Sequence, residues 1–521
     1  MTRVLQLGTN DWSLGVDFLC EVDWTCIDLA KPVRSLEEAG LDQESGAYSL
    51  VLVTEKLPPI WAEELLPYME AYCVFIDSRF HNYYRQTAFQ PWFDLKLAKF
   101  VHIVDVEYFV VEMTKRYFEG NYGERMNIKL IQLQEKFKGD FRIEGHNKLI
   151  IDHISEREWT PLLYWQRNIV VSPDRYLDLW LEYQTSQSLE IRLRLYYTRL
   201  GSINEVLDMS LHTEKDLKEA ILLAPREATY VTCCLEVRGE GGLSLRDLHV
   251  RHARNGFGEF LPGGDLLRDN NREELIFYFH PGNLKPPLNI YFSGYRTAEG
   301  FEGFWMMKDL DHPFILVGDP RSEGGAFYQV SQELEDKLLN KINQTLEKLG
   351  FSKEEIIFSG LSMGTTGALY FSSFYNPYAV VIGKPLVSLG NIAKKQRLVR
   401  PNDFQTSLDL VNRFDRGNQE EAMDYLNQCI VQQMAQGDYQ GTTFAVSYMR
   451  NDDYDDTAYY KLLEVLKDKP TKVISKSFLG RHNDNTAGII NWFLNQYKRL
   501  LNEAESRDDI ASREIDSMGT N

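Results

Sequence analysis

The stretch that decides the fold is EIIFSGLSMGTTGALYFSS, residues 355–373. Its apolar beginning, IIFS, is typical of a buried strand, and TTGALYFSS has the composition of a helix. Between them, the run from Gly360 to Gly364 has the form GxSxG. The glycines let the strand and the helix approach closely and leave Ser362 exposed at the helix N-terminus. The stretch therefore predicts the nucleophile elbow of an α/β-hydrolase domain, with Ser362 as nucleophile.

The base that such a serine needs has one candidate. The chain has ten histidines, and His482 alone follows Ser362, which is the order of residues in α/β-hydrolases. It lies in FLGRHNDN, after the predicted strand TKVISKSF and before the predicted helix TAGIINWFLNQYKRLL. The alternative is a surface histidine, but position and order favour a general base. His280, on an apolar run before the serine, is expected to be structural.

The acid should follow the strand TTFAVSYM, residues 442–449. The next segment, RNDDYDDTAYYKLLEVL, offers four aspartates: Asp452, Asp453, Asp455 and Asp456. A position a few residues past the strand favours Asp452, and Asp453 stays open as the alternative. Asp456 precedes a helix and suits an N-cap. The carboxylate would hold the tautomer of the imidazole and stabilise its charged form.

The oxyanion hole of this fold needs two backbone N–H groups. One is expected from Met363, the residue after the nucleophile. The other is expected from Gly294 or Tyr295, in the loop of NIYFSGYRTAEGFEGF, residues 289–304. In the following segment, Asp319 and Arg321 fit either a pocket wall or a structural ion pair.

Three kinds of pattern follow one another along the chain. Residues 1–125 alternate apolar runs with helical stretches, which predicts a small, Rossmann-like βα domain, although no GxGxxG supports a dinucleotide site. Residues 126–265 carry short runs with period-two alternation, typical of an antiparallel β-sandwich. Its tryptophans fit either a buried core or a carbohydrate-binding surface. Residues 266–505 are the expected catalytic domain, with a lid insertion at about 384–440, and 506–521 a flexible tail.

Composition limits the classes of protein. The 521 residues are 43% hydrophobic and carry a net charge of −19, which argues against a nucleic-acid partner. No apolar run is long enough to span a bilayer, and the N-terminus lacks the apolar core of a signal peptide. The six cysteines show no metal spacing and are expected to be free thiols in a reducing cytoplasm. No motif indicates a metal or a cofactor.

The domain order, the GLSMG elbow, the FSGYRTAEGFEGF loop and the GRHND loop together resemble one family over nearly the whole chain. It is the family of the second accessory secretory protein in the accessory Sec system of Gram-positive cocci. Ser362, Asp452 and His482 fall where that family places its triad. The resemblance implies an O-acetyltransferase that acetylates N-acetylglucosamine on serine-rich repeat adhesins and is needed for their export.

The resemblance also implies partners and a location. The partners are the sister accessory secretory proteins, the accessory Sec motor ATPase and the glycosylated adhesin. The location is cytoplasmic, at the periphery of the accessory Sec translocon. The acyl donor cannot be read from the sequence. Two alternatives stay open, a carboxylesterase or deacetylase in which water is the acceptor, and a non-catalytic secretion scaffold; a peptidase is least favoured.

Overall fold

The computed structural model describes residues 2–31, 36–41, 46–117, 120, 122–186, 188–202, 204–259, 262–398, 404–414 and 418–518. By its internal contacts the chain divides into two compact units. One unit comprises Met1–Phe141 and Ile151–Asp265, and the other comprises Arg142–Ile150 and Leu266–Asn521. Within the described ranges, no helix combines the length and the apolar character needed to cross a membrane.

The first unit contains a parallel five-stranded sheet in the order β2-β1-β3-β4-β5. Apolar residues cover both faces, so that strands such as LVLV are buried throughout, as is typical of parallel sheets. The elements are β1 Thr2–Gly8, β2 Val22–Asp28, β3 Leu50–Val53, α1 Trp61–Glu64, η2 Leu66–Tyr68, β4 Val74–Asp77, η3 Ser78–Phe80, α2 His81–Tyr84, α3 Phe89–Leu95, β5 Lys99–Val101 and α4 Val106–Thr114.

The same unit contains ten antiparallel strands joined in one hydrogen-bonded network. The elements are β6 Gly123–Met126, η4 Ile128–Leu130, β7 Ile131–Leu133, β8 Arg142–Glu144, β9 Lys148–Trp165, β10 Ile169–Val171, β11 Leu177–Thr185, β12 Glu190–Arg199, β13 Val206–Thr213, η5 Asp216–Lys218, β14 Ile221–Leu223 and β15 Thr229–His252. The connecting hairpin, residues 142–150, groups with the second unit.

One strand of this network joins two runs that the sequence suggested were separate. β15 pairs with β12 through its first half and with β11 through its second half. The change of partner falls at Gly239 and Gly241, which have φ values of 102° and 156°. A Cβ on Gly239 would lie 2.1 Å from the carbonyl oxygen of Ser188. These glycines therefore bend a continuous strand instead of ending it.

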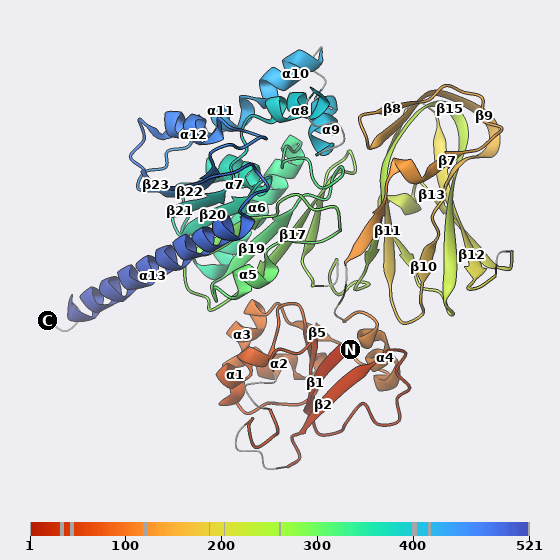
Figure 1. The fold of residues 1–521 in the computed structure, drawn as a ribbon. Helices are drawn as coiled ribbons and strands as arrows, with labels where there is room; N and C mark the ends of the chain where they lie inside the picture. The colour runs from red at the N-terminus through yellow and green to blue at the C-terminus, as the bar shows by residue number, and fades with distance from the viewer. Residues whose placement is uncertain are drawn as a thin grey trace. The chain divides into compact units, whose positions relative to one another are not determined.

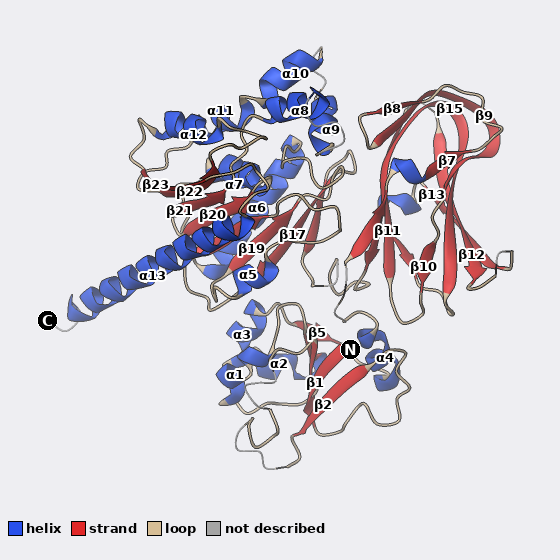
Figure 2. Ribbon diagram, viewed as in Figure 1, coloured by secondary structure: helices blue, strands red, loops and turns tan. Residues whose placement is uncertain are grey.

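The second unit contains an eight-stranded sheet in the order β16-β17-β19-β18-β20-β21-β22-β23, parallel from β19 to β23 with β17 antiparallel to β19. Helices cover it, with α13 in front in Figure 1 and α7 behind, and Figure 2 shows the same layers by element type. The strands are β16 Asp265–Arg268, β17 Glu274–His280, β18 Leu288–Phe292, β19 Phe314–Gly318, β20 Ile356–Leu361, β21 Ala379–Gly383, β22 Thr443–Met449 and β23 Lys472–Phe478.

The helices of this unit follow the chain in order. They are α5 Phe304–Lys308, α6 Gln332–Leu349, α7 Gly364–Ser372, α8 Leu389–Leu398, α9 Thr406–Arg413, α10 Gln419–Leu426, α11 Cys429–Gln436, α12 Ala458–Leu466 and α13 Thr486–Met518. The expectation of a mixed α/β fold with a largely parallel sheet is confirmed. The three sheets lie near the ranges for which three domains were expected, although β6 of the antiparallel network begins at Gly123 and β16 of the third sheet at Asp265. The division into domains stays a prediction.

Two segments bear on further expectations. The expected lid, about 384–440, contains α8 to α11, and its residues 399–403 and 415–417 lie outside the described part. The expected flexible tail, 506–521, is helical as far as Met518, because α13 continues through it. The sequence from 502 to 518 contains no glycine or proline that would end a helix. Residues 519–521 lie outside the described part.

Candidate active site

Ser362 lies in the turn between β20 and α7. Its φ of 52° is in the left-handed region, which is strained for a residue with a side chain. The turn is held by the Ser362 amide, which donates to the carbonyl of Gly383 (2.8 Å), and by the hydroxyl of Thr365, which donates to the carbonyl of Ser362 (2.6 Å). The side chain is half-buried. The elbow predicted from GxSxG has this geometry.

The glycines of the motif allow a close approach of the backbone on each side of the serine. A Cβ on Gly364 would lie 2.0 Å from the carbonyl oxygen of Phe292, at the end of β18. A Cβ on Gly360 would lie 2.5 Å from the carbonyl carbon of Gly364. Real Cβ atoms do not approach so closely, so the helix could not pack here with larger residues.

Three side chains from separate strand ends form one hydrogen-bonded chain. The Oγ of Ser362 lies 2.8 Å from Nε2 of His482, and Nδ1 of His482 lies 2.8 Å from Oδ2 of Asp452. An ionised carboxylate only accepts hydrogen bonds, so Nδ1 donates and Nε2 is left to accept the serine proton. His482 and Asp452 are 1% and 5% exposed, so water does not compete for these bonds.

The two neighbouring aspartates have different partners. Oδ1 of Asp452 accepts the amides of Tyr454 (2.9 Å) and Asp455 (3.2 Å), which fixes the carboxylate facing the imidazole. Oδ1 of Asp453 instead accepts the backbone amide of His482 (2.9 Å). Asp452 is therefore the carboxylate on the ring, and Asp453 holds the histidine loop through its backbone.

A third aspartate of this loop reaches the insertion. Oδ2 of Asp455 accepts the amides of Val387 (2.8 Å) and Ser388 (2.6 Å), immediately before α8. The hydroxyl of Ser388 accepts a hydrogen bond from the ammonium of Lys461 (2.8 Å). The start of the insertion is thereby fixed to the loop that carries Asp452.

The amides expected for the oxyanion hole differ in their partners. Among the described residues, the amide of Met363 has no acceptor, and it lies at the N-terminus of α7. The amide of Gly294 donates to Oε2 of Glu302 (2.6 Å), which also accepts the hydroxyl of Tyr291 (3.1 Å). An amide carries one hydrogen, so Gly294 is not open to a substrate oxygen in this structure. No pattern in the sequence indicated the Glu302 contact, which depends on the fold of the loop.

Aromatic rings from three segments surround the histidine. The ring centroid of Tyr454 lies 4.5 Å from that of His482, and the Tyr454 ring stacks on Phe404 with 5.2 Å between centroids. Phe404, in the insertion, also contacts Tyr295 at 5.3 Å and Phe327 at 5.2 Å. The insertion therefore supplies an apolar wall near the serine, and Tyr295 is 41% exposed there.

The sequence left two roles open for Asp319 and Arg321, a pocket wall or a structural ion pair, and their geometry is that of an ion pair. The two side chains form a bidentate ion pair with both distances at 2.8 Å, and Arg321 also donates to Glu273 at 3.0 Å. Arg413 of α9 shares the Glu273 carboxylate. Burial opposes the charge of Asp319, but Arg321 and backbone amides together lower the pKa of this carboxyl. The pair is structural and fixes α9 to the core.

His280 also has a structural place. It is buried, stacks on Phe314 at 4.9 Å between ring centroids, and its Nδ1 accepts the amide of Gly282 at 3.1 Å. The six cysteines all lie in the described part of the chain, and none of them forms a disulfide. In the same part, no group of three His, Cys, Asp or Glu side chains could hold a metal ion.

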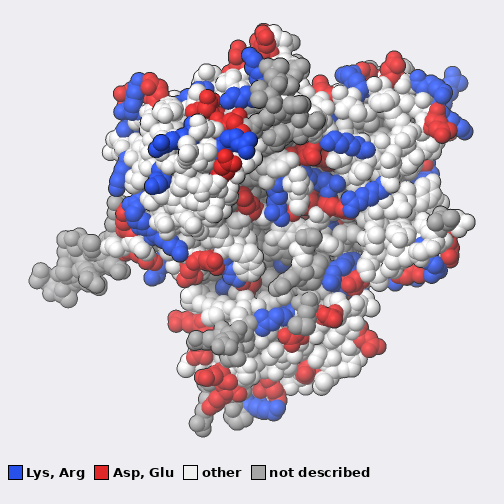
Figure 3. All heavy atoms as spheres, in the orientation of Figure 1, with Lys and Arg blue, Asp and Glu red and all other residues white. Residues whose placement is uncertain are grey.

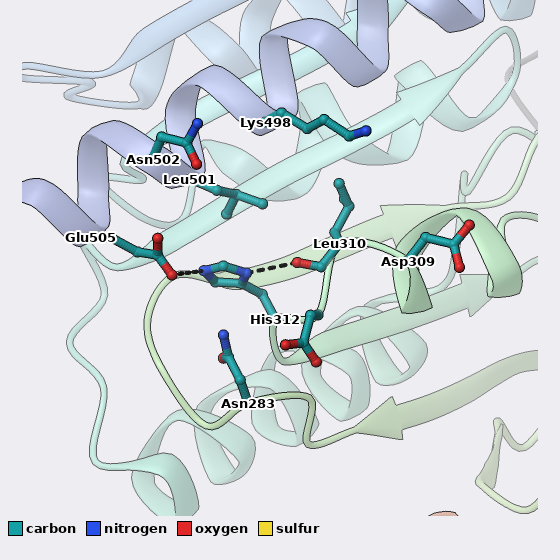
Figure 4. Close-up of a pocket in the computed structure, with 9 residues that line it drawn as sticks. Asn283, Asp309, Leu310, His312, Lys498, Leu501, Asn502 and Glu505 are labelled. Carbon is teal, nitrogen blue, oxygen red and sulfur yellow. Dashed lines mark hydrogen bonds and ion pairs between the residues drawn. The ribbon is translucent and has the colours of Figure 1, made fainter. Parts of the chain in front are cut away.

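A polar pocket of about 290 Å³ lies apart from the serine (Figure 4). Its walls come from the loops before β19 and after β17 and from α13, and none of Ser362, Asp452 and His482 lines it. His312 contacts the carbonyl of Leu310 at 2.9 Å and lies 3.7 Å from the carboxylate of Glu505. Because the parallel strands begin at this edge, the pocket is not part of the serine site.

Comparisons with known proteins cover almost the whole chain. The profile of the family described as accessory Sec system GspB-transporter matches residues 2–507. The accessory Sec system protein 2 of Staphylococcus aureus is 34% identical over 525 residues, which cover 98% of this chain and 99% of the relative. That of Streptococcus gordonii is 35% identical over 513 residues, covering 96% and 98%.

A solved structure is similar over the same length. It is the Glycosylation Associate Protein (Gap123) complex from Streptococcus agalactiae, with a TM-score of 0.85 and 33% sequence identity. The match covers 96% of this chain and 98% of that chain.

Proposed function

This chain belongs to the accessory Sec system GspB-transporter family, and we propose that it is a serine acyltransferase of that export system. The acceptor is N-acetylglucosamine on serine-rich repeat adhesins, and the transferred group is acetyl. The observation that carries the proposal is the chain of two 2.8 Å contacts from Ser362 through His482 to Asp452. The acceptor and the acetyl group come from the family resemblance.

The first half of the reaction forms an acyl-enzyme. His482 Nε2 takes the proton of Ser362 Oγ as the oxygen attacks the carbonyl carbon of the acyl donor. The buried carboxylate of Asp452 stabilises the imidazolium that forms. The imidazolium then gives its proton to the leaving group, and the acyl group remains on Oγ.

The second half of the reaction passes the acyl group on. A sugar hydroxyl attacks the ester carbonyl while His482 removes its proton, and Ser362 regains a proton as it leaves. The amide of Met363 is placed to donate to the oxyanion in both halves. The second donor is the amide of Gly294 or of Tyr295. If it is Gly294, that amide must first release Glu302, to which it is bonded in this structure.

Substrate choice is assigned to the insertion between β21 and β22. Its residue Phe404 contacts Tyr454, which in turn lies against His482. A ring at this place can stack on the apolar face of a sugar. Water as the acceptor would make the same site a carboxylesterase or deacetylase, and the chemistry of Ser362 would not change.

The partners proposed are the sister accessory secretory proteins, the motor ATPase of the accessory Sec system and the glycosylated adhesin. The similarity to a chain of the Gap123 complex supports the first of these. A location in the cytoplasm, at the periphery of the translocon, follows from the same role. A scaffolding role in this assembly can coexist with catalysis. Figure 3 shows acidic and basic side chains interspersed on the visible face.

The test compares wild type with Ser362→Ala on p-nitrophenyl acetate, with and without a peptide bearing N-acetylglucosamine. Mass spectrometry of the peptide reads the transfer. Serine-dependent release together with a peptide heavier by one acetyl group is the expected result. Release without peptide acetylation favours the esterase, and no release from either protein favours the scaffold.

A further inference from the structure

Lys384 lies between the strands that carry the reacting residues. It follows β21, which pairs with β20 on one side and with β22 on the other. Its neighbour Gly383 accepts the amide of Ser362, and its own amide donates to the carbonyl of Ser447 at 2.8 Å. Its φ of 57° is in the left-handed region, which is unusual for a lysine. The backbone on both sides therefore fixes this strained position beside the elbow.

Lys384 is a buried residue whose ammonium has no carboxylate in contact in the described part of the chain. The residue is 6% exposed, and Nζ donates to the hydroxyl of Thr486 at 3.0 Å. Within the described residues, no carboxylate oxygen lies within 4 Å of Nζ. Burying a cation in this way is unfavourable. Burial lowers the pKa of Lys384, and the charges of Asp452 and Asp484 oppose this effect.

The bond to Thr486 connects Lys384 to the histidine loop. Thr486 is the first residue of α13 and lies four residues after His482. Asp484, between them, accepts the amide of Arg481 at 2.9 Å. The loop is therefore held at one end by Asp453 on the backbone of His482 and at the other end by Lys384.

We propose that Lys384 is a positioning residue of the serine site, which holds the His482 loop and offsets the charge of Asp452. The inference rests on the proposed function, because it assigns His482 the role of base. A carboxylate beside an imidazole favours the charged imidazolium, and a nearby ammonium disfavours it.

The groups that face the imidazole define the expected sign. Asp452 contacts Nδ1 of the imidazole, and Ser362 contacts Nε2. Asp453 accepts the backbone amide of His482, and the ring of Tyr454 packs against the imidazole. These groups bring negative or no charge. Removing the Lys384 charge is therefore expected to favour the imidazolium, so that kcat/KM of the variant falls off at a higher pH than that of wild type.

The experiment measures kcat/KM for p-nitrophenyl acetate against pH in the full-length protein. Lys384→Met removes the charge at nearly constant length, Lys384→Arg keeps it, and Thr486→Val removes the acceptor alone. Lys472→Met, at the exposed start of β23, is the matched control for loss of a lysine. The expected result is an acid limb moved up by about 0.5–1 pH unit in Lys384→Met. In the other three variants, the acid limb of the pH dependence of kcat/KM is expected to stay at its wild-type position.

A second readout does not depend on turnover. Nuclear magnetic resonance follows the ring signals of His482 through the same pH range in the same variants. A midpoint that moves up only in Lys384→Met supports the proposal. A midpoint and an acid limb that stay in place overturn it, as does an equal shift in Lys472→Met. If wild type shows no serine-dependent turnover while the midpoint of the His482 ring signals still moves up in Lys384→Met, the proposed function is overturned and the role of Lys384 at the loop stands.

If Lys384→Met does not fold, the other two variants at this contact, Thr486→Val and Lys384→Arg, still test the proposal. Thr486→Val is expected to lower kcat/KM by about 2–10-fold because the loop is less well held, with the acid limb unmoved. Lys384→Arg with wild-type pH dependence agrees with a charge effect. Wild-type kcat/KM in Thr486→Val overturns the positioning role.

Discussion

The molecule contains two parallel sheets whose strand ends are used in different ways. In the first unit, the hydroxyl of Thr54 donates to the carbonyl of Leu7 (3.2 Å), and Asp77 pairs with Arg79 two residues on. In the second unit, side chains after three strands meet in the contacts from Ser362 through His482 to Asp452. Both sheets thus carry polar side chains at their strand ends, and in the second sheet side chains that follow three strands contact one another. A parallel sheet therefore brings strand ends together, but the residues at those ends decide whether they form a catalytic site.

Two glycines, one at the end of β1 and one at the elbow after β20, also differ in what lies close to them. At the end of β1, a Cβ on Gly8 would lie 2.0 Å from the hydroxyl oxygen of Thr54, so a side chain fills the space that the glycine leaves. At the elbow, a Cβ on Gly364 would lie 2.0 Å from the carbonyl of Phe292, so backbone fills it. The side chain of Ser362 is therefore left free to reach the histidine.

The largest expected effect is loss of the nucleophile. Ser362→Ala should lower kcat/KM for ester substrates by at least about 10⁴-fold, because no other group forms the acyl-enzyme. Steady-state kinetics on p-nitrophenyl acetate measure it. Thr54→Ala, at the edge of the first sheet, is the control and should keep wild-type kinetics. A similar loss in Thr54→Ala would remove the distinction between the two edges.

The acid gives the next effect. Asp452→Asn should lower kcat/KM by about 10³–10⁴-fold, because an amide does not hold the reactive tautomer or stabilise the imidazolium. Asp453→Asn should cost less than about 10-fold, since its amide oxygen can still accept the His482 backbone N–H. Parallel kinetics on the two purified variants decide. The assignment is wrong if the larger loss belongs to Asp453→Asn.

The buried ion pair of Asp319 and Arg321, in the second unit, is expected to give the largest effect on the free energy of unfolding. Asp319→Asn should lower the free energy of unfolding by about 3–4 kcal/mol at pH 7, because Arg321 stays buried without its bidentate partner. The carboxyl has a lowered pKa in the folded protein. Its contribution is therefore present above the unfolded-state pKa of about 3.9 and is lost as pH falls through the folded value. Urea unfolding at pH 7 and near pH 3, below the unfolded-state pKa, should show that the difference between variant and wild type shrinks.

The close packing at the elbow predicts a smaller cost. Gly364→Ala should lower the free energy of unfolding by about 2–3 kcal/mol, because its Cβ meets backbone that cannot move aside. Gly350→Ala is the control for strain alone, since Gly350 has a φ of 72° and a Cβ added to it would meet no atom within 4 Å. Its cost should be about 1 kcal/mol. Equal costs in thermal unfolding would show that packing at the elbow is not tight.

The smallest effect belongs to the first sheet. Asp77→Asn should lower the free energy of unfolding by about 1 kcal/mol or less, because the side chain caps a short helix and its partner Arg79 is largely exposed. Activity should stay at the wild-type level. Urea unfolding and ester hydrolysis on one preparation measure both. A loss of activity without a loss of stability would indicate that the first sheet also takes part in catalysis.

Local patterns in the sequence were enough for some parts of the molecule. The elbow was predictable because GxSxG with its strand and helix is a contiguous signal, and His482 was predictable because it alone follows the serine. The strand VDWTCID was not predicted, although apolar and polar residues alternate in it from Val22 to Cys26. The segment IWAEELLPYMEA, residues 60–71, has helical periodicity but forms two short helices, α1 and η2, which are separated at Leu65. Pro67, inside η2, has no amide with which to continue α1.

Other parts depend on residues far apart in the sequence. The contact of Glu302 with Gly294 and that of Lys384 with Thr486 are tertiary, and neither residue carries a pattern that marks it. The choice between Asp452 and Asp453 needed the direction of each carboxylate, which adjacent residues in a loop do not reveal. The run GEGG, residues 239–242, has the composition of a turn, although it bends one strand whose two halves pair with different partners.

The central claim is that Ser362 is a nucleophile activated by His482. Treatment with a fluorophosphonate, followed by intact mass and peptide mapping, tests it most directly, because such reagents react with activated serines. The expected result is a single adduct on Ser362, within the peptide containing residues 355–373, and no adduct in Ser362→Ala or His482→Ala. An unmodified wild-type protein, or an adduct that persists in His482→Ala at the wild-type rate, would contradict it.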